Sequence, residues 1–166
     1  MHPGPTSGGS THLGWTFSSP PEFESRVTTY LAEGLARHEK VMYVVDDPRR
    51  GQWPGELVDR GDLVIASITE IYGDERIVVA KQQRATFEEV LADALDEGYT
   101  GIRVAADNTS LIDGAERLEA WLEWEEMCEV FLAENPITGL CAFDVPRADP
   151  DSLRRTMDLH HASLPD

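Results

Sequence analysis

One carboxylate stands where the sequence otherwise places apolar side chains. Residues 114–135 predict a long helix, and Glu125 falls inside its apolar stripe, which comprises Leu118, Trp121, Leu122, Trp124, Cys128, Phe131 and Leu132. A buried carboxylate without a partner is costly, or it takes up a proton. Arg103, on the preceding predicted strand, is the partner we expect. Two interpretations stay open for this pair, an internal strut between sheet and helix or a polar anchor in an apolar ligand pocket.

Other candidate ligand-binding residues lie at the predicted carboxyl ends of strands, where open α/β sheets bind their ligands. The strand ends carry Phe17, Asp46, Asp107 and Asp144, with Trp15 close by. Trp15, Trp121 and Trp124 could form an aromatic wall for an organic molecule, although core packing is the simpler interpretation. Asp46 and Asp47 resemble the acids that hold Mg²⁺ or a base in nucleotide-binding proteins, but a solvated strand end before Pro48 is favoured.

The histidines do not predict a metal site. His12 and His160 could meet only if the last helix returned to the first strand, and a metal site needs more ligands at short spacing than the sequence shows. The pair His160-His161 favours a solvated helix end. No serine lies in a GxSxG turn, so no catalytic residue is predicted.

The first predicted turn has no phosphate-binding loop. Such a loop needs GxxxxGK[ST], whereas "FSSPPEFES" contains neither Gly nor Lys. Ser19 instead predicts a helix N-cap, followed by two prolines in the first turn and by Glu22 at the capping-box spacing. Glu22 places negative charge where a phosphate would bind, so ATP hydrolysis is not expected.

Helical and strand patterns alternate along the chain. Strands are predicted at 12–17, 40–47, 62–68, 101–107 and 139–145, and helices within 20–37, 55–61, 86–99, 114–135 and 149–161. Residues 70–85 show no clear pattern. The alternation predicts an α/β fold of three layers, in which helices cover both faces of a mainly parallel sheet. Residues 1–11 predict a flexible N-terminal arm and residues 162–166 a C-terminal tail.

The composition limits the partners. The 14 basic and 31 acidic residues of the 166 give a net charge of −17, which argues against nucleic acid and against an anionic membrane surface. The sequence shows no run long enough to span a membrane and no signal segment. Cys128 and Cys141 lie in apolar surroundings and predict reduced thiols, so a cytoplasmic location is expected.

Several segments together resemble the MEDS family, the methanogen/methylotroph DcmR-type sensory domains. They are "HLGWTF…EFESRVTTYLAEGLARHEKVMYVVDD", "DEGYTGIRVAAD", "LEWEEMCEVFLAENPITGLCAFD" and "LRRTMDLHH", so the resemblance covers residues 12–161. It implies a degenerate RecA/KaiC-like fold without a phosphate loop. The positions that match the family pattern are His12, Gly34, Arg103, Glu125, Cys141, Asp144 and His160. The chain departs from that pattern at Trp15, Phe17, Trp124 and Phe143.

The resemblance implies a sensory domain and not an enzyme. We expect residues 12–161 to bind a small organic effector, without a cofactor, and to signal to a protein partner such as an anti-sigma-pathway or histidine-kinase component, in transcriptional or sigma-factor control. The predicted ligand-binding residues are His12, Trp15, Phe17, Asp46, Arg103, Asp107, Trp124, Glu125, Asp144 and His160. A homodimer is compatible with this prediction. Two alternatives stay open, a protein-interaction module without a small ligand and an atypical nucleotide-binding protein.

Overall fold

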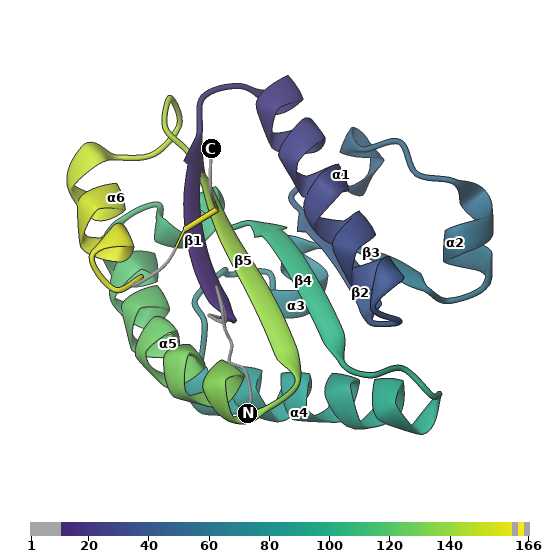
Figure 1. Cartoon of the computed structure of the whole chain (residues 1–166). Helices are drawn as coiled ribbons and strands as arrows, with labels where there is room; N and C mark the ends of the chain where they lie inside the picture. The colour runs from purple at the N-terminus through teal and green to yellow at the C-terminus, as the bar shows by residue number, and fades with distance from the viewer. Residues whose placement is uncertain (1–10, 161–162, 165–166) are drawn as a thin grey trace, which may run out of the picture.

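The computed structural model describes residues 11–160 and 163–164. Its strands and helices alternate along most of the chain, as Figure 1 shows. The strands are β1 (His12–Phe17), β2 (Lys40–Val45), β3 (Leu63–Ser67), β4 (Ile102–Asp107) and β5 (Ile137–Asp144). The helices are α1 (Pro20–Ala36), α2 (Gly55–Asp59), α3 (Ile68–Tyr72), α4 (Ala80–Asp96), α5 (Ala115–Glu134) and α6 (Pro150–Met157), with short 3-10 turns η1 (Pro48–Arg50) and η2 (Thr109–Ile112).

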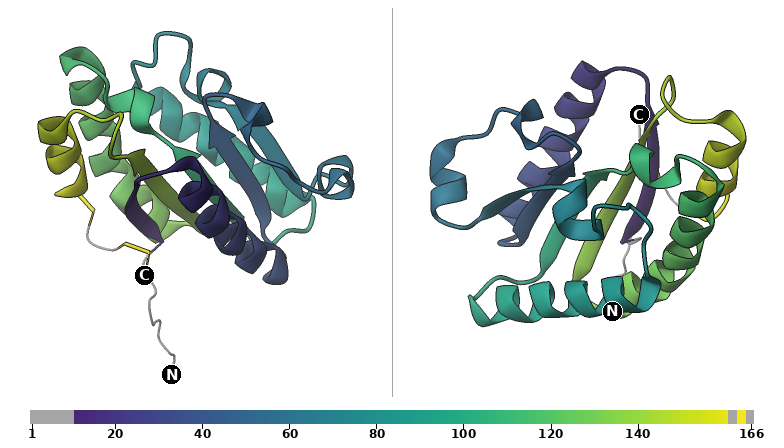
Figure 2. Two further views of the ribbon diagram at one scale, coloured as in Figure 1. Left: turned by 90° about the horizontal axis from the view of Figure 1, so that it is seen from above. Right: turned by 180° about the vertical axis from the view of Figure 1, so that it is seen from behind.

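The five strands form one parallel sheet in the order β1-β5-β4-β2-β3. Helices cover both faces of this sheet: α1 and α2 lie on one side, and α3, α4 and α5 lie on the other (Figures 1 and 2). The predicted three-layer α/β architecture is therefore confirmed. Its specific likeness to RecA and KaiC stays a prediction.

Each face of the sheet has its own hydrophobic core, because successive side chains of a strand point to opposite faces. In β4, for example, Ile102 and Val104 belong to the core under α4 and α5, whereas Ala105 belongs to the core under α1. All six residues of β4 are buried. A strand buried on both faces shows no polar alternation, so the sequence could not tell which side chain faces which helix.

The first turn is a helix cap, as the sequence predicted. The Ser19 side chain accepts a hydrogen bond from the Glu22 backbone N–H at 3.4 Å. The Glu22 carboxylate accepts one from the Ser18 N–H at 2.7 Å, one residue before the position that a standard capping box uses. The anionic side chain thus occupies the N-terminus of α1.

The segment without a clear pattern, residues 70–85, contains the end of α3 and the beginning of α4. Ser67 and Glu70 form a complete capping box at α3. Helix α4 begins at Ala80, six residues before the predicted helix, and its first residue already packs in the core. The first turn was not predicted, because the basic and amide side chains of "KQQR" show no apolar spacing typical of a helix.

The predicted N-terminal arm lies outside the described residues except for Thr11. Of the predicted C-terminal tail, Ser163 forms a parallel bridge with Gly14 of β1, and Leu164 packs against the core under α1. These two residues therefore lie against the sheet. The short segment beside β1 in Figure 1 shows this return.

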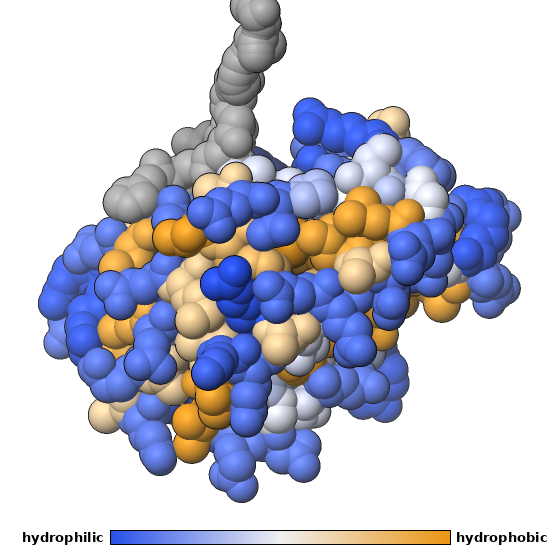
Figure 3. Space-filling model, turned by 90° about the horizontal axis from the view of Figure 1, so that it is seen from below, coloured by the Kyte–Doolittle hydropathy of each residue, from blue (hydrophilic) through white to orange (hydrophobic). Residues whose placement is uncertain are grey.

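The surface is mainly hydrophilic on the side where α4 lies. Figure 3 shows apolar side chains on this side that polar ones surround and interrupt. The exposed apolar side chains of α4 and α5 include Leu95 and Val130. Within the described part of the chain, none of the helices is long and apolar enough to cross a membrane.

Candidate functional site

Four ionisable side chains meet between the sheet and α5. They are His12 of β1, Glu125 of α5, Cys141 of β5 and His160, which follows α6, and we call them the His–Glu–Cys cluster. Their nearest nitrogen, oxygen and sulfur atoms all lie within 4.8 Å of one another. The side chains of His12, Glu125 and His160 are 2%, 0% and 1% exposed. The cluster is therefore a buried polar site inside an otherwise apolar core.

Glu125 is the centre of this cluster. Its Oε1 lies 3.1 Å from His12 Nε2, and its Oε2 lies 2.8 Å from His160 Nε2. The Cys141 thiol donates to Glu125 Oε1 at 3.6 Å. The buried carboxylate predicted from the sequence thus has partners, but they are two imidazoles and a thiol instead of a guanidinium.

Gly14 makes room for the last member. It lies on the same face of β1 as His12, two residues further along, and a Cβ atom at this position would come within 2.5 Å of His160 Cγ. The rings of His12 and His160 lie 4.6 Å apart between centroids. The prediction that His160 is a solvated helix end is wrong, because the chain after α6 returns to β1 and buries this ring.

The surroundings of the cluster shift its pKa values. Burial disfavours a charged imidazole, but the hydrogen bonds and charges of Glu125 and then Glu129 outweigh it and raise the pKa of His12. Burial likewise disfavours a charged carboxylate, yet His12 and His160 together lower the pKa of Glu125. Burial raises the pKa of the Cys141 thiol, and the neighbouring Glu125 raises it further. An ionised carboxylate beside a neutral thiol is the state that these shifts favour.

A cavity of about 40 Å³ lies beside the cluster, and His12 and Cys141 belong to its wall. The other walls come from β4, β5, α4, α5 and the end of α3. Phe87 and Trp124 line it with stacked rings 6.1 Å apart. The remaining lining residues are Tyr72, Val104, Ala106, Asn108, Trp121, Cys128, Leu132, Ile137, Gly139 and Leu140.

Two polar atoms in the cavity wall are buried without a hydrogen-bond partner among the described residues. They are the Trp121 Nε1 donor and the Asn108 Oδ1 acceptor. Buried polar groups normally have partners, so these two atoms mark places where a bound molecule could donate or accept a hydrogen bond.

The predicted pair of Arg103 and Glu125 does not form. Arg103 lies on the α1 face of β4, where its Nε donates to Glu39 Oε1 at 2.7 Å and its Nη1 to the Tyr30 carbonyl at 3.3 Å. Gly34 of α1 permits this approach, since a Cβ there would come within 2.7 Å of Arg103 Cδ. The prediction is wrong because Arg103 and Glu125 lie on opposite faces of the sheet.

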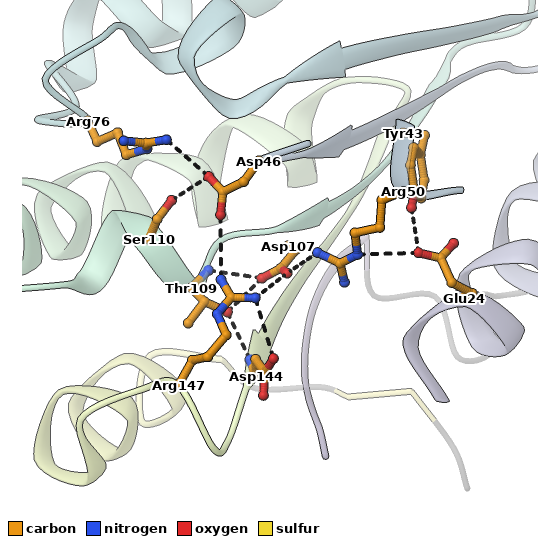
Figure 4. A network of polar contacts seen from close by, with 10 residues as sticks. All are labelled: Glu24, Tyr43, Asp46, Arg50, Arg76, Asp107, Thr109, Ser110, Asp144 and Arg147. Carbon is orange, nitrogen blue, oxygen red and sulfur yellow. Dashed lines mark hydrogen bonds and ion pairs between the residues drawn. The ribbon is translucent and has the colours of Figure 1, made fainter. Parts of the chain in front are cut away.

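The carboxyl ends of the strands do bring the predicted acids together (Figure 4). Asp107 accepts from Arg50 Nη1 at 2.7 Å and from Arg147 Nη1 at 3.2 Å. Asp46 lies 3.5 Å from Arg147 Nη2, and Asp144 lies 3.4 Å from its Nη1. Arg76, Thr109 and Ser110 complete this strand-end network. Its carboxylates are therefore already engaged by cationic and hydroxyl groups of the same chain.

Comparison with protein-family models gives one match. Residues 11–161 match the model described as MEDS, the MEthanogen/methylotroph, DcmR Sensory domain. The chain belongs to the MEDS family. A search of curated proteins found no match for this MEDS domain.

The ten predicted site residues of the MEDS domain fall into separate groups. His12, Glu125 and His160 form the cluster, and Trp124 lies in the cavity wall beside it. The strand-end network contains Asp46, Asp107 and Asp144, but not Phe17. Trp15 and Phe17 pack in the core under α1, where Arg103 also lies, so they do not reach the cavity.

Sequence reasoning missed five contributors to the site, and one of them is Asn108, which directly follows β4. Cys141 was noted as a core thiol and a family match, but not as a site residue. Glu129 stands one helical turn after Glu125, a spacing that could have signalled a shared face. Tyr72 of α3 and Phe87 of α4 contact Trp121 and Trp124 of α5. These contacts join distant parts of the chain, so sequence spacing does not indicate them.

Proposed function

We propose that this MEDS domain is a non-catalytic sensor that binds a small organic effector in the cavity beside the His–Glu–Cys cluster. The observation that carries the proposal is an apolar, aromatic-walled cavity, two of whose lining residues have a buried polar atom without a hydrogen-bond partner among the described residues. Small-molecule sites usually combine these two features. Membership in a family of sensory domains supports the same conclusion.

The size of the cavity selects small effectors. An apolar cavity of about 150 Å³ holds benzene, so about 40 Å³ suits a molecule of only a few non-hydrogen atoms. Trp121 Nε1 could donate to an oxygen of such a molecule, and Asn108 Oδ1 could accept from a hydroxyl or amide group. A short alcohol, carbonyl compound or amide meets both conditions, whereas a nucleotide is too large.

The absence of catalysis is part of the proposal. Nucleophilic cysteines require a lowered pKa, and the pKa of the Cys141 thiol is raised. The acids at the strand ends are paired with Arg50, Arg76 and Arg147, which disfavours their use as general bases or as Mg²⁺ ligands. These features support a binding role for both regions.

Signalling to a protein partner is the second half of the proposal. It is supported by the sensory family and by the position of α5. This helix carries Glu125 into the His–Glu–Cys cluster and Trp124 into the cavity wall, and it also reaches the surface at Val130. A shift of α5 on effector binding would be transmitted to that surface.

The test is a thermal-shift screen of small alcohols, carbonyl compounds and amides, combined with tryptophan fluorescence. Binding to the native state raises Tm, and Trp121 and Trp124 should report it. The variant Ala106→Val adds two methyl groups at the cavity wall and should abolish the Tm shift. Ala105→Val is the matched control, because Ala105 packs on the opposite face of the sheet, and it should keep the Tm shift even if its own Tm is lower.

A second variant tests the polar anchor. Trp121→Phe keeps an aromatic wall but removes the Nε1 donor. It should weaken the binding of effectors that carry an oxygen more than the binding of apolar effectors of the same size. Equal Tm shifts in Ala106→Val and Ala105→Val would contradict the cavity as the site. No Tm shift with any compound, together with tight binding of a regulatory protein, would favour the interaction module.

A further inference from the structure

We propose that His12, Glu125, Cys141 and His160 form a metal site for a divalent transition-metal ion, with zinc as the best-fitting ion. The inference concerns the cluster and not the cavity, and it does not depend on the proposed effector. The sequence had predicted no metal site, because its four ligands are far apart along the chain.

The spacing of the donor atoms suits tetrahedral coordination. Zinc bonds of about 2.0–2.3 Å imply donor-to-donor distances of about 3.3–3.8 Å. Cys141 Sγ lies 3.6 Å from Glu125 Oε1 and 3.8 Å from His12 Nε2, and His12 Nε2 lies 3.1 Å from Glu125 Oε1. No pair in the set exceeds 4.8 Å. Small side-chain rotations would therefore bring all four donors around one ion.

Both imidazoles are oriented as metal ligands are. His12 Nδ1 lies 2.6 Å from Glu129 Oε1, and His160 Nδ1 lies 3.1 Å from the Thr156 carbonyl oxygen. A metal-ligating histidine typically donates its second ring N–H to a carboxylate or a backbone carbonyl. When Nδ1 donates to these partners and a metal ion takes the place of any proton on Nε2, the Nε2 lone pair of each ring points into the cluster. The outer partners thus prepare both Nε2 atoms to bind a cation.

The contact between His160 and Glu125 offers a place for such a cation. Nε2 and Oε2 lie only 2.8 Å apart, yet each is buried without a hydrogen bond of acceptable geometry among the described residues. An imidazole nitrogen and a carboxylate oxygen at this distance need a positive charge between them, which either a proton on Nε2 or a metal ion can supply. A metal ion coordinated by both atoms would satisfy them together.

The donor set indicates which ion would bind. Two imidazoles and a thiolate favour a borderline-soft ion over Mg²⁺ or Ca²⁺, which prefer oxygen ligands. Four protein ligands in a closed, buried site are typical of structural zinc. Coordination would convert the Cys141 thiol to a thiolate with release of its proton to solvent. The ion would also join the chain after α6 to β1, β5 and α5.

The experiment uses the full chain, purified with zinc and then dialysed. Elemental analysis should give one zinc per chain. The cobalt form should show the strong visible bands of tetrahedral Co²⁺ and a thiolate-to-cobalt charge-transfer band. Cys141→Ser should remove the charge-transfer band, whereas Cys128→Ser, which changes the other buried cysteine, should keep it.

Chelator competition measures the contribution of each residue. Glu129→Gln changes an outer partner whose side chain is 38% exposed, so it should preserve the fold. It should lower the affinity for zinc by about 10–100-fold. His160→Ala should lower the affinity for zinc further. His38→Ala, which changes an exposed histidine, should leave that affinity unchanged. Circular dichroism confirms that each variant is folded.

Three results would overturn the inference. They are no stoichiometric zinc or cobalt, a cobalt spectrum without the thiolate band in the parent protein, and equal zinc affinity in the parent, Cys141→Ser and His160→Ala. Equal zinc affinity in all three proteins would mean that the metal binds to acidic surface groups and not to the cluster. An effector-dependent Tm shift that persists in metal-free protein would leave the proposed function intact while the metal inference failed.

Discussion

Breaking the contact between Arg103 and Glu39 tests whether the buried charges on the two faces of the sheet are independent of each other. The guanidinium lies on the α1 face, with its side chain 6% exposed, and Glu39 is 15% exposed. The perturbation is Glu39→Leu, which removes the carboxylate at 2.7 Å and leaves a buried cation. Arg103→Met and the double variant complete a thermodynamic cycle.

The structure sets the expected size of the effect. Removing one partner of a fully buried ion pair costs about 3–5 kcal/mol. Arg103 retains the Tyr30 carbonyl at 3.3 Å, and its guanidinium lies 4.8 Å from the centroid of the Tyr30 ring. We therefore expect Glu39→Leu to lower the free energy of unfolding by about 2–3 kcal/mol. The double variant should come within about 1 kcal/mol of the parent, because apolar replacement of both partners is often nearly neutral.

Urea denaturation followed by circular dichroism measures these differences. The coupling free energy between Arg103 and Glu39 should be about 1–3 kcal/mol, whereas Arg103 and Glu125 should be additive within about 0.5 kcal/mol. Glu33→Gln is a further control, since this carboxylate is 61% exposed and 3.6 Å away; it should cost less than about 1 kcal/mol. Coupling of Arg103 with Glu125 above that with Glu39 would refute the reasoning.

Three further predictions concern other parts of the molecule. Gly14→Ala should displace His160, because the new Cβ would meet its ring within 2.5 Å; urea titration should show a loss of about 1–3 kcal/mol, and an unchanged midpoint would contradict the packing of this ring. Ser19→Ala should cost about 1 kcal/mol through loss of the α1 cap, whereas Ser18→Ala, which keeps the backbone donor to Glu22, should be nearly neutral in the same assay. Tyr99→Phe should raise the pKa of the Asp62 carboxyl, because the hydrogen bonds from Tyr99 and then from Arg60 lower it. A carboxylate with a lowered pKa stabilises the fold above its unfolded pKa, and this effect is lost as pH falls through its folded pKa. The pKa of Asp62 from an NMR titration should therefore be higher in the variant, and the variant should lose less stability in acid than the parent.

Much of the local structure was predictable. The Ser19 cap follows from residue types at short spacing, and β1 was predicted with its observed bounds. The beginning of α4 was not, because its first turn carries mostly polar side chains and its stability comes from packing against α5. Sequence spacing reports local hydrogen bonds and amphipathic faces well, but it does not report contacts between distant segments.

The sequence indicated several residues of the candidate site, but not how they are arranged. His12, Trp124, Glu125 and His160 were all named, and the structure places them in the cluster or in the cavity wall. Their relationship was not predictable, because it depends on the return of the chain after α6 to β1. Cys141 joins them only because β5 lies beside β1 in the sheet.

The sequence by itself determined that Glu125 would be buried and would need a partner. A carboxylate within an apolar helical stripe is taken out of water when the helix packs, and it stays ionised there only with a partner. Only the tertiary structure decided that this partner is a pair of histidines and not Arg103. The strands are buried on both faces and carry no alternation that a reader of the sequence could use, so the face on which each polar side chain lies is fixed by how the helices pack.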